Sequence, residues 1–438
     1  MRQLGKRWLR GSVAAATLAG IATLGLVTAG SAGAADPGVT AKQITIGYIF
    51  SGTGVAASEF KTADKTCDAR VKRQNAQGGV NGRKIKVIAI DDQSSGANLT
   101  ATKDLIQNRG AFMVVNNSSF AFLSYRTMLD SKVPMVGGGY DGDYYNKPGA
   151  ESLFSALGVP FSGISNDATA RIMKLLGATK SAAVSYGASP SSTASADALQ
   201  NLAVPSLGMQ AVYTNKSVDF GTTDVGPIVL GIKNAGADAD YLPLVESSNF
   251  AILQGLRQNG VQMKANVLAT GYGQDLLNSP IAQTLDKHTV VFQTFKPVEL
   301  KDSGTKQFQA DLKKYEGMTG VPSFGDYTGY ITCDMAILGL QKAGATPTRQ
   351  SFVSGLRTVS SYNQAGLACQ PIALDTAHYG KFADVGCEYA MYVKNGKFVI
   401  MNNGKAIVGK TIGPADQLAS VTYTPPANQT AGPVTKVK

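Results

Sequence analysis

The segment from Gln43 to Asp92 constrains the fold of this chain more than any other. It begins with the apolar run Ile44–Phe50 and ends with a second one, Ile85–Ile90, and such short runs are typical of buried strands. Between the two runs, apolar residues at spacings of three and four fall on one face of a helix, namely Phe60, Ala63, Cys67 and Val71. The segment therefore predicts a strand, a helix and a second strand.

Paired glycines mark the end of that helix. Gly78 and Gly79 can supply the left-handed backbone conformations that a helix exit and a turn require. Because two strands joined by a helix run parallel, the loop after the first strand opens at the carboxyl edge of the sheet, where open α/β folds bind ligands. We therefore expect a binding loop at residues 51–58, which begins with Ser51.

The same alternation continues along the chain, so two α/β series in tandem imply two sheets. A Thr346-Pro347 pair is expected to cap and begin a short helix near the C-terminal end. Further helices are expected at residues 98–108, 120–129, 166–176, 225–235, 249–259, 305–315 and 325–343. Further strands are expected at residues 111–115, 133–136, 181–185, 210–213, 241–245, 267–270, 370–374 and 389–393.

The first 34 residues are interpreted as a secretory signal. A basic start precedes the uncharged stretch Gly11–Gly30, and Ala32–Ala34 fits a small-x-small cleavage site, so cleavage is expected after Ala34 or Ala35. A membrane anchor is the alternative, which the Ala/Gly/Thr-rich composition disfavours. No cysteine lies near the cut to carry a lipid. We expect a soluble protein outside the cytoplasm, either held at the cell envelope or released.

The length and the net charge of the mature chain limit its domain number and its classes of partner. About 400 mature residues exceed what one hydrophobic core usually supports, so two domains are expected. Removing the signal deletes four basic residues and no acid, which lowers the formal net charge from +11 to +7. This modest excess is spread along the chain without a basic block interleaved with aromatics, so nucleic acid is not an expected partner.

Four cysteines in an exported chain are candidates for disulfides. Cys369 and Cys387 flank a short turn-rich segment and are expected to form a local bridge. Cys67 and Cys333 each lie on the apolar face of a predicted helix, where a long-range bridge and two buried thiols are both open interpretations. The residues alone do not decide among the three pairings.

Two phosphate-binding patterns occur in settings that do not suit phosphate. Residues 404–411 match the P-loop pattern, but Ile412-Gly-Pro414 follows where the chemistry requires a helix. Residues 137–142 match the dinucleotide fingerprint after a strand, but no helix start follows. We expect the second set of glycines to allow close approach of the backbone to another ligand, with a plain turn as the alternative.

The sequence contains few of the residue patterns that catalysis or metal binding requires. The two histidines, His288 and His378, are far apart in the sequence, metal-ligand spacings are missing, and there is no G-x-S-x-G nucleophile elbow. The pair Asp91-Asp92 is explained by a solvated strand end. We therefore expect a protein without catalytic residues, cofactor or metal.

With strands, loops and turns placed, the chain resembles the exported solute-binding proteins of branched-chain amino acid ABC transporters, the leucine/isoleucine/valine-binding group. The motifs that carry the resemblance are Ile44-Thr-Ile-Gly followed by Ser51-Gly52, the run Asn75-Ala-Gln-Gly-Gly-Val-Asn-Gly-Arg83, and Asp91-Asp92. The similarity covers about residues 44–400. It implies the type I periplasmic binding fold, an α/β architecture of two Rossmann-like lobes joined by three hinge crossings.

The resemblance also implies domain boundaries. Lobe I is expected at residues 42–153 and 296–366, lobe II at 155–294 and 368–411, and a disordered tail at 412–438. The crossings are placed near Phe154, Phe295 and residues 366–369. Cys67 and Cys333 would then share lobe I, and Cys369 and Cys387 would share lobe II, which favours these two pairings.

In this family the ligand lies between the lobes. The resemblance implies that Ser118 and Ser119 hold a substrate carboxylate, and amides at the following helix start suit an anion, although helix capping alone is the other interpretation. The loop after the next strand would contribute three further ligand contacts, Gly139, Tyr140 and Asp141. Asp141 stands where relatives that bind amino acids often carry Thr, and its charge disfavours a carboxylate beside it.

The second lobe supplies the other expected contacts. Tyr272 or Asp275 stands where relatives place an acid that binds the substrate ammonium. The segment that usually offers Tyr-Gly to the cleft reads Ser189-Pro-Ser191 in this chain. Glu246 is expected either to supply the missing negative charge or to lie in solvent. Tyr330 is expected either to form an aromatic wall or to pack in the core.

The implied function is non-enzymatic capture of a small polar organic solute, such as an amino acid, an amide or an organic acid. The implied partners are that solute and the membrane subunits of an ABC permease, and we expect the protein to be a monomer. The alternative is a ligand-sensing subunit that docks on a membrane receptor without transport.

Overall fold

Two large β-sheets, with one short two-stranded sheet beside them, organise the part of the chain that the computed structural model describes, which is residues 36–158, 164–222, 224–381 and 386–414. The expected signal at residues 1–34 lies outside the described residues, as does most of the expected tail, from residue 415 onward. The prediction of two sheets is therefore confirmed for the described part of the chain. The division into lobes at the stated boundaries stays a prediction.

The first sheet is parallel throughout and has the strand order β2-β1-β3-β4-β5. Strand β1, which lies between β2 and β3, is buried along most of its length, as coverage of both faces requires of a parallel strand. The strands are β1 (Gln43–Phe50), β2 (Lys84–Asp91), β3 (Val114–Asn117), β4 (Met135–Gly137) and β5 (Leu153–Ser155).

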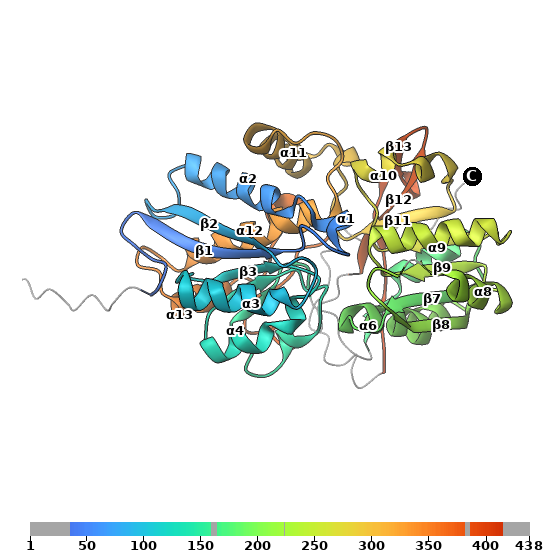
Figure 1. Cartoon of the computed structure of the whole chain (residues 1–438), viewed down its shortest axis with the longest axis horizontal. Coiled ribbons are helices and arrows are strands. Elements are labelled where there is room, and N and C mark those ends of the chain that lie inside the picture. The colour runs from blue at the N-terminus through green and yellow to red at the C-terminus, as the bar shows by residue number, and fades with distance from the viewer. Residues whose placement is uncertain (1–35, 159–163, 223, 382–385, 415–438) are drawn as a thin grey trace, which may run out of the picture. The chain divides into compact units, whose positions relative to one another are not determined.

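The helices of the first sheet come from both ends of the chain (Figure 1). The early helices are α1 (Ala57–Phe60), α2 (Ala63–Ala76), α3 (Ala97–Lys103) and α4 (Tyr125–Ser131). The late helices are α11 (Ser303–Glu316), α12 (Phe324–Lys342) and α13 (Arg349–Leu356). Helix α12 packs on α2 and also contacts β3 and β4, so the first sheet is completed by residues from far along the chain.

Helix α12 is the most buried helix of this part. Ser323 and Asp326 form a capping box at its start, which satisfies two backbone N–H groups. Cys333 in its middle bonds to Cys67 of α2, and the next residue, Asp334, lies 2.7 Å from Arg70 Nε of α2. The disulfide and the ion pair fix α12 against α2.

The second sheet has the order β13-β12-β11-β10-β9-β7-β8, with β14 paired to β12. Strands β8, β7, β9, β10 and β11 are parallel, and β12 and β13 return antiparallel. The strands are β7 (Lys180–Tyr186), β8 (Gln210–Val218), β9 (Ala239–Leu242), β10 (Ala265–Leu268), β11 (Thr289–Gln293), β12 (Cys387–Lys394), β13 (Lys397–Ile400) and β14 (Ile407–Val408).

The helices of this second part follow its strands in turn. They are α5 (Ala168–Leu175), α6 (Pro190–Ala198), α7 (Val204–Ser206), α8 (Gly226–Asn234), α9 (Glu246–Gln258) and α10 (Gln274–Asn278). Helix α6 is absent from the sequence-based prediction. It begins at Pro190, and the hydroxyl of Ser189 accepts the N–H of Ser192 as its N-cap.

Three local predictions are wrong. The N-cap of α13 is Thr348, whose hydroxyl accepts the N–H of Ser351, and not Thr346. Residues 370–374 form no strand, because only Ile372 pairs, in an isolated bridge with Tyr362. Ile412, expected in the tail, pairs with Ser165 in a short two-stranded sheet of β6 (Ser165–Asn166) and β15 (Thr411–Ile412).

Both expected disulfides are confirmed. Cys67 bonds to Cys333, and Cys369 bonds to Cys387. The segment that contains Cys369 lies beside the strand exit of β11, where Phe295 pairs with Ala368 and the N–H of Cys369 donates to the carbonyl of Thr294 at 3.0 Å. Two of the three expected crossing segments therefore pair with each other.

Candidate ligand-binding site

A cavity of about 360 Å³ opens at the carboxyl ends of the parallel strands of both sheets. The loops after β3, β4 and β5 line it from the first sheet, and the ends of β7, β9, β10 and β11 line it from the second. Parallel strands present their ligand-binding loops at this edge. Its volume falls in the range of pockets that hold small organic ligands.

Residues of the first sheet form one wall of the cavity. Ser119 follows β3, and Gly139 and Tyr140 follow β4, with Phe60 of α1 and Phe324 of α12 beside them. Gly139 has a φ of +88°, and a Cβ there would lie 1.9 Å from the hydroxyl oxygen of Ser155. A side chain at this position is therefore excluded both by the backbone conformation and by space.

Residues of the second sheet form an aromatic wall. Tyr186, at the end of β7, stacks on Phe220 with ring centroids 4.0 Å apart, and both rings line the cavity. The Tyr186 hydroxyl donates to Ser248 at 2.8 Å, so its polar end is already paired. Across the cavity mouth, the Ser191 hydroxyl of α6 donates to the backbone carbonyl of Tyr140.

Three of the residues predicted as ligand contacts line this cavity: Ser119, Gly139 and Tyr140. The Tyr140 hydroxyl donates to Asn117 Oδ1 at 2.8 Å, so its polar end is already paired. Ser189 and Ser191, noted at the place of a usual Tyr-Gly, also line it as the start of α6.

Ser118 and Ser51 belong to a buried polar network behind the cavity wall. Ser118 is fully buried, and its hydroxyl donates to Asp92; the Ser51 hydroxyl donates to the same carboxylate at 3.0 Å. A substrate carboxylate at Ser118 would lie beside the Asp92 carboxylate, which is unfavourable. Ser118 and loop 51–58 are not among the described residues that line this cavity, so their binding roles stay predictions that this geometry does not favour.

Replacing Ser118 by alanine is expected to lower the free energy of unfolding by about 1–3 kcal/mol, because the buried Asp92 loses a hydrogen-bond donor. Ligand affinity should change little. Ser119→Ala is the matched control one residue away, and it should alter affinity with little change in the thermal midpoint. Comparing thermal midpoints and ligand titrations of the two variants tests the assignment, and a reversed pattern would contradict it.

Asp141 is turned away from the cavity. Its carboxylate accepts the hydroxyls of Tyr144 and Tyr145, and burial raises the pKa of Asp141 to about 7. These two tyrosines follow within one turn. Asp141 is not among the described residues that line the cavity, and its role as a ligand contact stays a prediction.

Tyr272 and Tyr330 lie in the core. The Tyr272 hydroxyl donates to Glu299 at 2.5 Å and accepts the Val298 N–H. The Tyr330 hydroxyl donates to Asp311 at 2.6 Å and accepts from Arg73. Neither residue is among the described residues that line the cavity, which favours the core-packing interpretation of Tyr330, and their roles as ligand contacts stay predictions.

Glu246 is the first residue of α9 and faces an acidic group rather than the cavity. It is 8% exposed, and the acid Glu59 of α1 is one of its neighbours, while Lys61 of the same stretch pairs with Asp275 at 2.5 Å. Burial, with Asp275 nearby, raises the pKa of Glu246 to about 7. Its burial contradicts the solvent alternative, and α9 contacts α1 here. The role of Glu246 as a ligand contact stays a prediction.

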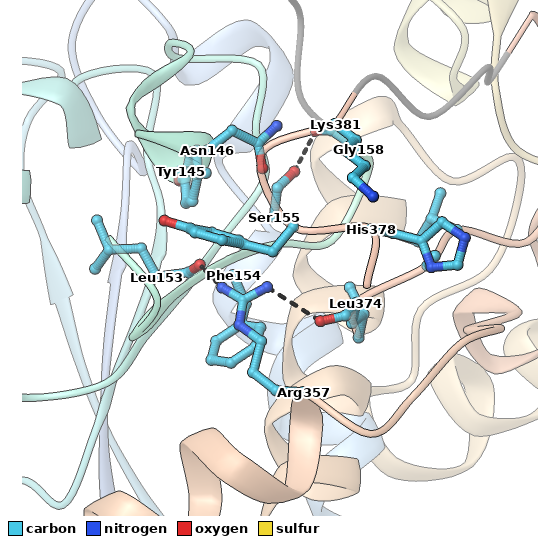
Figure 2. Close-up of a pocket in the computed structure, with 13 residues that line it drawn as sticks. Tyr145, Asn146, Leu153, Phe154, Ser155, Gly158, Arg357, Leu374, His378 and Lys381 are labelled. Carbon is cyan, nitrogen blue, oxygen red and sulfur yellow. Dashed lines mark hydrogen bonds between the residues drawn. The ribbon is translucent and has the colours of Figure 1, made fainter. Parts of the chain in front are cut away.

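A second, much smaller cavity of about 40 Å³ lies beside Arg357 (Figure 2). The guanidinium donates to the carbonyls of Leu374 and Leu153 and lies 4.2 Å from the ring centroid of Phe154. Burial lowers the pKa of Arg357 to about 10. A space of this size holds one or two waters, so this arginine is a structural clamp.

Two polar residues of the large cavity were not found from the sequence. Gln293 ends β11 and Glu388 lies near the start of β12, and both are buried side chains that line the cavity. A polar residue inside an apolar strand run was the available signal in both cases.

Among the described residues, none of the helices is both long enough and apolar enough to span a membrane. The same residues contain no cluster of three or more potential metal ligands of the His, Cys, Asp and Glu types. His378 lies 2.6 Å from Asp375, and His288 bonds to the Lys264 carbonyl, so the two histidines serve separate local contacts.

Sequence and structural comparisons place this geometry in a known family. A family model described as periplasmic binding protein matches residues 43–397, and the chain belongs to this family. No curated protein matches the chain. The resemblance inferred from the sequence is thereby confirmed at the level of the family and of its α/β fold.

Solved structures share the fold at low sequence identity. A fatty acid ABC transporter substrate-binding protein from Thermomonospora curvata is 17% identical with a TM-score of 0.70, over 85% of this chain and 94% of that one. A branched-chain amino acid ABC transporter protein from Thermus thermophilus with bound valine is 16% identical with a TM-score of 0.68, over 84% and 97%. An R. palustris solute binding protein in complex with benzoate is 14% identical with a TM-score of 0.66, over 86% and 98%.

Proposed function

We propose that this protein is an extracytoplasmic solute-binding protein that captures one small organic molecule between the strand ends of its two sheets and delivers it to the membrane subunits of an ABC permease. The observation that carries the proposal is the cavity of about 360 Å³, which both sheets line. Membership of the periplasmic binding protein family supports it. Similar structures are described as ABC transporter proteins with bound valine or benzoate.

Capture follows from contacts made by both sheets at once. A ligand shifts a conformational equilibrium only through its different affinity for the two states. A molecule that touches both the Tyr140 side and the Tyr186 side of the cavity therefore stabilises the closed arrangement, in a hinge motion. The closed surface is what the permease recognises in this proposal.

The cavity walls favour a solute with an apolar portion. Aromatic and aliphatic side chains predominate among the described lining residues, and no lysine or arginine is among them. The solutes to test first are therefore amino acids, amides and organic acids that carry an apolar portion. The proposal also includes removal of the signal, action outside the cytoplasm as a monomer, and binding without turnover.

A thermal-shift screen of metabolites tests the proposal. A ligand at a hundredfold excess over its dissociation constant stabilises the protein by about 2.7 kcal/mol, which raises the thermal midpoint by several degrees. Small-angle scattering with the ligand should show a smaller radius of gyration. Ala269→Trp, which fills the cavity from the loop after β10, should abolish the shift while leaving the unliganded midpoint near that of the wild type.

Absence of any shift across the three solute classes would contradict the proposal. Delivery to a permease is separated from sensing by uptake of the identified ligand in a deletion strain. Loss of uptake supports transport, whereas unchanged uptake with loss of a transcriptional or motility response supports a docking receptor subunit.

A further inference from the structure

The large cavity continues around the carboxyl edge of the second sheet. Phe292 and Gln293 are successive residues at the end of β11, and both line the cavity. Successive side chains of a strand point to opposite faces of its sheet. A single cavity that is lined by both residues therefore reaches around the end of β11 and has a part on the face that carries Phe292.

Strand pairing assigns two further lining residues to the Phe292 face. The antiparallel register of β11 with β12 puts Glu388 on this face, since Gln293 pairs with the next residue of β12. Val267 of β10 pairs with Tyr241 on one side and with Val290 on the other, which puts Tyr241 on the same face. The rings of Tyr241 and Phe292 have centroids 6.2 Å apart. These residues form the floor of this part of the cavity.

Helix α6 forms a side wall of the same space. Its lining residues Ser191, Ala194, Ser195 and Ala198 recur at spacings of three and four, so they lie along one side of the helix. Tyr241 is only 6% exposed, so the space is enclosed. This part of the cavity, termed the side chamber, is defined by Ile164, Ala194, Ala198, Tyr241, Phe292 and Glu388.

The polar side chains of the side chamber are already paired. Burial, helped by the like charge of Asp167, raises the pKa of Glu388 to about 8, so at pH 7 most of this acid holds its proton. The chamber therefore offers a ligand apolar surface rather than charge. Three polar side chains at its border have partners: Glu388 with the hydroxyl of Thr169 at 2.9 Å, Ser195 with the carbonyl of Ser192 at 3.0 Å, and Asn166 with the N–H of Ala168 at 2.9 Å.

The part of the cavity between the two sheets has a different character. Ser119 follows β3 of the first sheet and Thr294 follows β11 of the second, and both line the cavity. Neither hydroxyl has a hydrogen-bond partner among the residues that the structure describes. These hydroxyls suit a polar group, because they can replace the water that such a group loses on binding.

We propose that the solute is an elongated molecule with a polar group at one end and an apolar chain at the other, and that its chain occupies the side chamber. The polar group then stays between the two sheets, near Ser119 and Thr294. This inference rests on the proposed solute-binding function and names the shape and chemical class of the ligand. Each methylene that enters the chamber should strengthen binding about fourfold.

Probes of increasing chain length test the proposal on the unmodified mature protein. Butanoate, hexanoate and octanoate, and the three matching amides, are titrated by calorimetry at pH 7. Within whichever series binds, affinity is expected to rise about fourfold per methylene until the chamber is filled. The matched control is 2-propylpentanoate, a branched isomer of octanoate with the same charge and atoms, which should bind at least tenfold more weakly than octanoate.

Two variants assign the length dependence to the side chamber. Ala198→Leu fills the chamber from α6, so it is expected to weaken octanoate or octanamide at least tenfold and to leave the four-carbon probes within twofold. Asp197→Leu adds the same side chain at the next position, which is exposed and does not line the cavity, and it should alter neither affinity. Unliganded melting curves verify that both variants fold.

The outcomes separate this inference from the proposed function. Affinity that does not rise with chain length in a series that binds, a branched isomer as tight as octanoate, or equal weakening of short and long probes by Ala198→Leu would overturn the assignment of a chain and leave solute capture intact. A ligand from the metabolite screen without an apolar chain, when no probe binds, would overturn it as well. If neither the probes nor the screen produces a ligand, the proposed function itself fails.

Discussion

Replacing Cys67 and Cys333 by alanine is expected to lower the free energy of unfolding by about 5 kcal/mol, the largest effect of any change considered for this chain. The bond joins residues 266 positions apart, so it restricts the unfolded chain over most of its length. It also ties α2 to α12, the buried helix that covers the first sheet. Urea unfolding followed by circular dichroism measures the change.

The local bridge provides the matched control. Cys369 and Cys387 are only 18 positions apart, and by loop entropy their replacement should cost about 3 kcal/mol. An equal or larger loss of stability from the local bridge would contradict the ranking.

Raising the pH from 5 to 8 is expected to destabilise the contact between α1 and α9 by about 2–3 kcal/mol. Burial raises the pKa of Glu246 from the ordinary glutamate value of 4.5 to about 7, so the folded state holds its proton over a range where the unfolded chain has lost it. For an acid with a raised folded pKa, stability is present at low pH and lost as the pH rises through the folded value.

The neighbours of Glu246 act in the same direction. Burial and the charge of Glu246 raise the pKa of Glu59, and burial raises the pKa of Asp326 at the start of α12. Lys61, the cation of the group, is shared with Asp275. Glu246→Gln removes one acid and relieves Glu59, so this variant should show a flatter stability profile between pH 5 and 8.

Thermal midpoints across that pH range, with and without ligand, measure the effect. Asp197→Asn is the control, because Asp197 is an exposed acid paired with Lys216 at 2.8 Å and should leave the profile unchanged. A wild-type profile that rises with pH, or one that Glu246→Gln does not flatten, would count against this explanation. A ligand that requires closure should likewise bind more weakly at pH 8 through this contact.

The strands of this fold were readable from the sequence because parallel strands are buried on both faces and appear as apolar runs. Strand β1 is the clearest case, with Ile44, Ile46 and Ile49 fully buried. Helix α6 was missed because Pro190–Ala198 is rich in serine and alanine and has no apolar stripe. Its start signal, Ser189 followed by Pro190, was nevertheless present.

The edge that carries the cavity was predictable, but side-chain directions within it were not. Ser118 and Ser119 are adjacent, and one joins the buried Asp92 network while the other lines the cavity. Strand exits twist, so neighbouring residues there diverge in ways that residue types do not encode. Tyr330 was ambiguous because its partner Asp311 lies on another helix, and such distant pairing is set by packing.

Glu388 and Gln293 show the complementary failure. Gln293 follows the apolar residues 290–292, and Glu388 directly precedes the strand predicted at residues 389–393, so neither was singled out in such an apolar run. An acid or an amide in such a run must find a partner or face a cavity. Polar residues inside apolar runs are therefore a second signal, beside the loop residues Ser119, Gly139 and Tyr140, for residues that line the cavity.

The late origin of α12 has a consequence for how this chain matures. Residues 324–342 cover strands made from residues 43–137, and Arg349 donates to the carbonyls of Ala111 and Phe112. A chain delivered from its N-terminus through a narrow pore would have its first sheet uncovered until three quarters of the sequence had emerged. The first sheet therefore cannot complete its buried core until the residues of α12 have been added.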